Sequence, residues 1–115
     1  SGRVFQMKSD APTEALRRIQ ECVKRRDILW TYHVFMRMQG RCIPRSSILD
    51  SVASYEIIES YPEDKYMASY LVRAECGADV VHVLFAFDIA DKFVRIITTY
   101  RPDAALWSED GRKRP

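Results

Sequence analysis

The sequence predicts an α+β domain in which N-terminal helices pack on one face of an antiparallel β-sheet of about four strands. Three stretches of the C-terminal half alternate apolar and polar residues, as half-buried strands do, and these are residues 66–76, 80–88 and 93–100. Short connections at 77–78 and 89–92 are typical of an antiparallel meander. The N-terminal half instead carries apolar residues at helical spacing.

The elements that precede the meander follow from start and stop signals. In order, they are a helix over 12–26, a short edge strand over 28–31, helices over 32–39 and 45–53, and a strand over 55–61. Pro12 suits the first turn of a helix, which Ser9 or Asp10 can cap. Thr31 is a plausible cap for the second helix, and Gly40 ends it.

The turns of the meander also predict its register. The two-residue loop sets Arg73 opposite His82, and the four-residue loop sets Thr99 opposite His82 on the next strand. This register places Tyr100 on the core face. The predicted core consists of Leu16, Ile19, Phe35, Ile48, Val52, Tyr70, Val72, Val81, Val83, Phe85, Val94 and Ile96.

Length and composition indicate a single soluble domain over 7–115, with 1–6 as a cloning remnant before a natural start at Met7. A chain of 115 residues, 47% of them hydrophobic, can build one core without a disulfide or a metal. Its three cysteines have no paired spacing, which favours reduced thiols in the cytoplasm, and we expect neither metal nor cofactor. No stretch approaches the ~20 apolar residues of a membrane span.

Five residues form the candidate site, although no strong catalytic motif is present. His33 and Arg37 lie one helical turn apart, so a general acid/base can stand beside a phosphate clamp. The alternative is a histidine that bonds a strand end beside a solvated arginine. Arg73 and His82 are predicted neighbours on the open sheet face and suit an anionic ligand, or His82 is structural. Tyr100 ends the last strand, where packing is its default role.

Several short motifs together resemble a known family. They are His33-x-x-x-Arg37, the residues at 40–43 and 81–83, and those at 99–103 followed by Trp107. In this order they resemble the bacterial family called domain of unknown function 4258, over residues 28–107. That family is similar in arrangement to the RelE/ParE-like toxins, some of which cut messenger RNA without a metal. The resemblance implies a small helix-plus-antiparallel-sheet protein. Separately, we expect His33 and Arg37 to lie within reach of the sheet end near Tyr100 or Trp107.

Two functions follow from these observations. The first is a toxin-like, metal-independent endoribonuclease or RNA-binding protein, in which the 2′-hydroxyl of RNA attacks the adjacent phosphate. His33 and His82 are then the acid and base, Arg37 and Arg73 stabilise charge, and Tyr100 transfers a proton. The alternative is a non-enzymatic module that binds a protein partner or acts like an antitoxin. The expected partner is RNA for the first function and a small antitoxin-like protein for the second. The chain is expected to be a monomer or a homodimer paired through its edge strand.

Overall fold

The computed structural model of the protein describes residues 2–61, 68–87 and 93–102. Within these ranges the chain forms three α-helices, one 3₁₀ turn and five strands. In chain order the elements are α1 (Gly2–Arg25), β1 (Ile28–Leu29), α2 (Tyr32–Gly40), α3 (Arg45–Leu49), the 3₁₀ turn η1 (Val52–Ser54), β2 (Glu56–Tyr61), β3 (Ser69–Cys76), β4 (Asp79–Phe87) and β5 (Val94–Tyr100). The predicted α+β class is confirmed.

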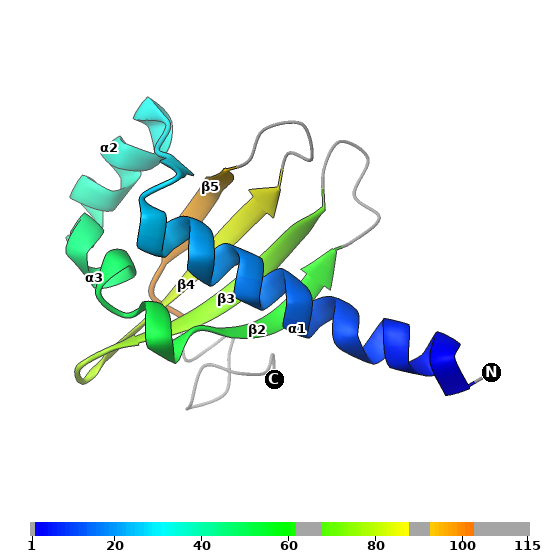
Figure 1. The fold of residues 1–115 in the computed structure, drawn as a ribbon. Helices are drawn as coiled ribbons and strands as arrows, with labels where there is room; N and C mark the ends of the chain where they lie inside the picture. Colours follow the sequence, from blue (N-terminus) through cyan, green and yellow to red (C-terminus); the bar gives the residue numbers. More distant parts are fainter. Residues whose placement is uncertain (1, 62–67, 88–92, 103–115) are drawn as a thin grey trace.

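Helix α1 crosses one face of the sheet, and α2 and α3 lie next to each other at the left of the view in Figure 1. The strand order is β1-β5-β4-β3-β2, in which β2 to β5 form an antiparallel meander and β1 adds to β5 in parallel. Within the described ranges the sheet is therefore mixed and five-stranded. The expected edge position of β1 is confirmed. Its pairing with β5 was not predicted, because a strand of two residues is too short to show an alternating pattern.

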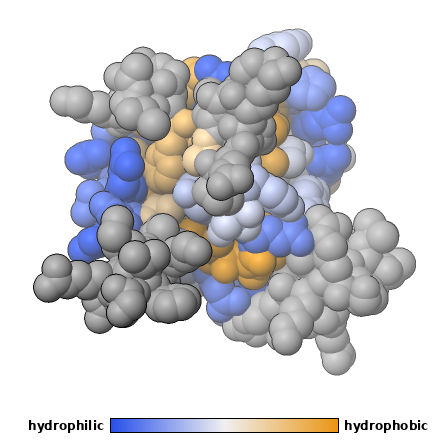
Figure 2. Space-filling view, turned by 90° about the vertical axis from the view of Figure 1, so that its right-hand side faces the viewer, coloured by the Kyte–Doolittle hydropathy of each residue, from blue (hydrophilic) through white to orange (hydrophobic). Residues whose placement is uncertain are grey.

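The end of the molecule opposite α2 and α3 faces the viewer in Figure 2. Hydrophobic residues gather near its centre, and hydrophilic residues lie on both flanks. This is the distribution expected when layers of secondary structure pack around one core. In the described part of the chain, no helix combines the length and the apolar character that crossing a membrane requires.

Helix α1 begins at Gly2, well before the predicted start at residue 12. Pro12 therefore lies within the helix, although its missing N–H is better suited to a first turn. The residues before it include Met7 and Lys8, which are good helix formers, and the helix continues through Asp10 instead of being capped there. The capping signal at Ser9 and Asp10 therefore does not mark the start of this helix.

The predicted helix over 45–53 is divided into α3 and η1. The hydroxyl of Ser51 donates to Ser47 O at 2.5 Å, and the hydroxyl of Ser54 donates to Ser51 O at 2.7 Å. Serine side chains that bond to nearby carbonyls compete with the regular helical pattern. These two serines account for the change from α-helix to a 3₁₀ turn.

The core lies between the sheet and the helices and contains most of the predicted residues. Those that are buried as predicted are Ile19, Ile48, Tyr70, Val72, Val81, Val83, Phe85, Val94 and Ile96. Leu16 and Val52 are only partly buried, at the edge of this core. On α2 the buried residues are Val34 and Met38, four positions apart, and Phe35 points to the side and is partly exposed. The prediction for Phe35 was therefore wrong.

The hairpin of β3 and β4 has the predicted register. Its two-residue turn begins at Gly77, whose φ of 65° lies in the left-handed region that glycine adopts easily. Arg73 pairs with His82, and Tyr70 pairs with Phe85, as expected. A short turn at a fixed position was sufficient to define this ladder.

The hairpin of β4 and β5 follows the prediction up to Ile96, and then the ladder shifts by one residue. The extra residue at this β-bulge is Ile97, and the shift turns the later side chains to the opposite face. His82 therefore pairs with Tyr100, and the predicted pairing with Thr99 was wrong. Thr99 is 1% exposed, and Tyr100 leaves the predicted core face for the face that carries His82.

Candidate functional site

Three of the five candidate residues form a row across the sheet, on the face away from α1. Arg73 on β3, His82 on β4 and Tyr100 on β5 are successive cross-strand neighbours. The two rings of His82 and Tyr100 meet edge to face, with Nδ1 3.4 Å from the phenol oxygen. His82 is fully buried and Arg73 is 5% exposed, whereas Tyr100 is partly exposed. The bulge in β5 is what brings Tyr100 into this row.

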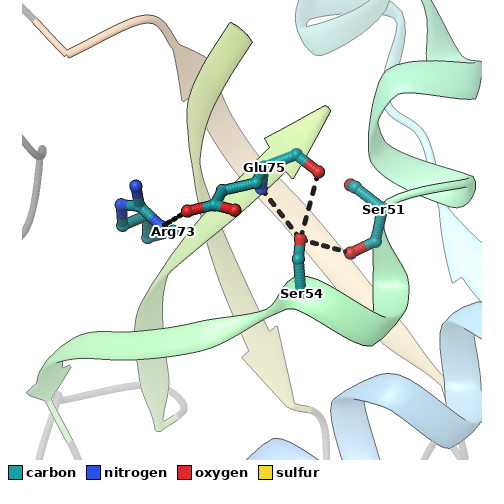
Figure 3. A network of polar contacts seen from close by, with 4 residues as sticks. All are labelled: Ser51, Ser54, Arg73 and Glu75. Atoms are coloured by element: carbon teal, nitrogen blue, oxygen red, sulfur yellow. Dashed lines mark hydrogen bonds and ion pairs between the residues drawn. The ribbon is translucent and has the colours of Figure 1, made fainter. Parts of the chain in front are cut away.

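The guanidinium of Arg73 has an acidic partner in the same strand. Its Nη1 lies 2.7 Å from Oε1 of Glu75, whose side chain is about half exposed. The backbone N–H of Glu75 donates to the hydroxyl of Ser54 at 2.8 Å, and that hydroxyl also contacts Ser51 O (Figure 3). The turn η1 therefore holds the end of β3 that carries the ion pair. A buried arginine paired in this way is not a spare positive charge.

The other two candidates form an exposed pair on α2. Nε of Arg37 donates a hydrogen bond of 2.9 Å to Nε2 of His33, one helical turn earlier. Both side chains are exposed. The helix begins where the hydroxyl of Thr31 accepts from the N–H of Val34 at 3.2 Å, as its predicted role as a cap requires. The prediction that His33 and Arg37 share one helical face is confirmed.

Two arginines outside the candidate set attach the end of α2 to the sheet. Nη1 of Arg41 donates to Thr99 O at 2.6 Å, and Nη1 of Arg101 donates to Arg41 O at 2.5 Å. Arg101 also donates to Cys42 O at 3.0 Å and pairs with the carboxylate of Asp79 at 2.9 Å. Although both arginines lie in the motifs quoted above, their partners are mostly backbone carbonyls that no side-chain pattern reveals.

The five candidates therefore fall into two separate groups. α2 reaches the sheet end beside Tyr100 through Arg41, and His33 lies about 12 Å further along the helix axis. Within the described ranges no hydrogen bond or ion pair joins His33 or Arg37 to the row on the sheet. Trp107, the other expected neighbour, lies outside the described residues.

The exposed pair belongs to a basic stretch of the chain. Residues 28–49 contain no aspartate or glutamate, and their basic residues are His33, Arg37, Arg41 and Arg45. The guanidinium of Arg45 lies over the rings of Trp30 and Phe35, at 5.0 and 5.1 Å from their centroids. Cation–π contacts of this kind hold Arg45 and leave Arg37 as an exposed cation of α2.

An open cavity of about 330 Å³ adjoins the end of α2, and its lining is Met38, Gln39, Cys42, Ile43 and Pro44. This lining is largely apolar and carries no charged side chain. No cluster of three or more histidine, cysteine, aspartate or glutamate side chains in the described ranges is arranged to bind a metal ion. The three cysteines all lie in the described ranges and form no disulfide, with Cys22 buried and Cys42 exposed.

Comparison with known proteins gives one match. The family described as Domain of unknown function (DUF4258) matches residues 30–101, a range that includes α2, the meander and all five candidate residues. No curated protein and no solved structure matches the chain. The similarity to RelE/ParE-like toxins stays a prediction.

Proposed function

We propose a function from the site itself, because this chain belongs to the family Domain of unknown function (DUF4258), whose description names no activity. The protein is a metal-independent RNA-binding and RNA-processing protein of the toxin-like kind, acting in the cytoplasm. Its point of contact with RNA is the exposed pair of His33 and Arg37. The observation that supports this proposal is the 2.9 Å hydrogen bond of that pair within a stretch free of carboxylates.

The pair offers two of the functions that RNA cleavage needs, a general base and a cation that stabilises charge on the phosphate. Arg37 is exposed and uses Nε for its bond to His33, which leaves the terminal nitrogens of its guanidinium as donors for a phosphate. The lone pair of His33 Nε2 accepts that bond, so it acts as a base once Arg37 turns to the phosphate and the bond opens. It takes the proton of the 2′-hydroxyl, whose oxygen attacks the adjacent phosphorus while the 5′-oxygen leaves with a proton from solvent.

The row on the sheet is less suited to contact RNA, because two of its residues are buried. His82 and Arg73 lie inside the protein, so RNA reaches them only after a rearrangement, whereas the pair on α2 is exposed in the structure as it stands. His82, Arg73 and Tyr100 are the second proposed site. A substitution in each group distinguishes the two.

Incubation of labelled RNA with the protein in EDTA tests the cleavage. We expect His33→Ala to slow cleavage ~100- to 10,000-fold, the usual effect of removing a general base. Arg17, exposed on α1, provides the control Arg17→Ala, which should cleave like the parent protein. Loss of cleavage in His82→Ala alone, with the fold intact, would assign the reaction to the row on the sheet.

Binding is measured separately because it does not require turnover. We expect the affinity for RNA to fall steeply as salt rises, and Arg37→Ala to weaken binding and flatten this dependence. The proposal is overturned if the parent protein neither cleaves RNA nor binds it in a salt-sensitive way.

A protein partner is the second candidate function. β1 lies at the edge of the sheet, and Leu29 in this strand is 36% exposed. An edge strand can pair with a strand of another chain. Gel filtration of the protein alone, and with a small antitoxin-like protein, distinguishes a monomer from a homodimer or a stoichiometric complex. A stable complex without any RNA binding would favour this function.

A further inference from the structure

We infer that Tyr32 stacks on a base of the bound RNA, and that the RNA which α2 recognises is therefore single-stranded. This inference rests on the proposed function and adds the class of substrate to it. Tyr32 is 78% exposed, whereas the other exposed large apolar side chains that the structure describes range from 36% to 46%. A ring held in water to this extent, at the start of a helix, is available to stack on a ligand.

The position of the Tyr32 ring is defined by the helix. Tyr32 is the first residue of α2, directly after the capping Thr31. Met36 follows one turn later on the same side and is 46% exposed. α2 thus presents two neighbouring rows to solvent, an apolar one of Tyr32 and Met36 and a basic one of His33 and Arg37.

These two rows correspond to the two parts of a nucleotide. A phosphate needs cationic donors, which Arg37 supplies, and a base needs a flat apolar surface, which Tyr32 supplies. Because Tyr32 precedes His33 in the chain, both parts can be contacted by one turn of one helix. Stacking on an aromatic ring tolerates every base, so this arrangement predicts little sequence preference.

A double-stranded RNA does not fit this arrangement. In a duplex the bases stack on one another and present only their edges, so an exposed tyrosine ring finds no base face. A single strand can turn its bases outward onto an aromatic side chain. The absence of carboxylates from residues 28–49 favours a polyanion over a protein as the ligand of this surface.

Fluorescence anisotropy tests the inference with a labelled oligoribonucleotide whose 2′-hydroxyls are methylated to prevent cleavage. It is measured as a single strand and annealed to its complement, in EDTA. We expect the parent protein to prefer the single strand, and Tyr32→Ala to weaken this binding about 5- to 150-fold. Tyr32→Phe keeps the ring and should bind like the parent. Tyr61→Ala, at a tyrosine of β2 that is 42% exposed, is the matched control.

The outcomes separate this inference from the proposed function. Equal affinity for duplex and single strand, or unchanged binding by Tyr32→Ala while Arg37→Ala loses it, would overturn the stacking role and leave RNA binding in place. No RNA binding by the parent protein would overturn both. If Tyr32→Ala instead disrupts a protein complex and leaves RNA binding unchanged, α2 is a protein-binding surface and the inference is wrong.

Discussion

The exposed pair on α2 and the buried row on the sheet contain the same residue types in different environments. His33 and Arg37 bond to each other in contact with solvent, whereas His82 is fully buried and Arg73 is paired inside the protein. A histidine and an arginine in water are available to a phosphate and contribute little to folding. The same two residues in the interior can only be removed by breaking packing and hydrogen bonds. Burial therefore makes the row on the sheet part of the packed fold and leaves the pair on α2 accessible to a ligand.

The largest expected effect tests this difference in stability directly. His82→Ala should lower the free energy of unfolding by about 2–4 kcal/mol, because it leaves a cavity and removes the contact with Tyr100. The matched variant His33→Ala should change it by no more than about 0.5 kcal/mol, as exposed substitutions do. Urea denaturation of both variants measures the difference. Equal destabilisation by the two would show that burial does not separate the groups.

Burial also affects Tyr55, whose phenol is neutral at ordinary pH. Its hydroxyl donates to Ile48 O at 2.7 Å, and burial raises the pKa of Tyr55 above its ordinary value. Above about pH 10 the unfolded chain loses this proton first, so the free energy of unfolding should fall as pH rises from there toward the higher pKa of the folded state.

The control for this pH dependence is Tyr55→Phe. It should cost about 1.5 kcal/mol at neutral pH, through the lost hydrogen bond to Ile48. It should also show a smaller loss of stability above about pH 10, since the group that titrates is gone. Urea denaturation of both proteins at neutral and alkaline pH measures this. An unchanged pH profile in the variant would assign the alkaline loss to other groups.

The smallest expected change in the free energy of unfolding is at Thr99, which can be compared with its neighbour Thr98 in the same strand. Thr99 is buried and its hydroxyl donates to His82 O at 2.9 Å, so Thr99→Val should lower the free energy of unfolding by about 1 kcal/mol. Thr98 is partly exposed, and Thr98→Val should have an effect of less than about 0.5 kcal/mol. Thermal or urea unfolding decides between them. If the costs are reversed, the bulge does not place Thr99 in the interior.

The two hairpins show how far the sequence predicts the sheet. In the first, a glycine turn of two residues defines the register, and Arg73 meets His82 as expected. In the second, three β-branched residues at 97–99 follow one another, and a threonine fits either face through its methyl and hydroxyl groups. The pattern therefore does not distinguish the regular ladder from the bulge. The choice between them depends on which of these side chains packs into the core.

The candidate site was predictable where it depends on local spacing alone. His33 and Arg37 are four residues apart, so any helix over this stretch brings them together. The attachment of α2 by Arg101 depends on carbonyls about half the chain away, such as Arg41 O. No spacing in the sequence contains that information. The exposure of Tyr32 also became visible only in the folded chain, because an apolar residue of an amphipathic helix is normally expected in the core.

The bulge at Ile97 makes β5 tolerant of a change in its own length at one position. Ile97 is 41% exposed, so many substitutions there should be tolerated. Loss of that one codon should also keep the pairing, because Thr98 would follow Ile96 directly and still lie opposite Leu84. Thr99 would stay in the interior and Tyr100 beside His82. The residue that interrupts the ladder is therefore the one that an in-frame deletion could remove without turning either face of the domain.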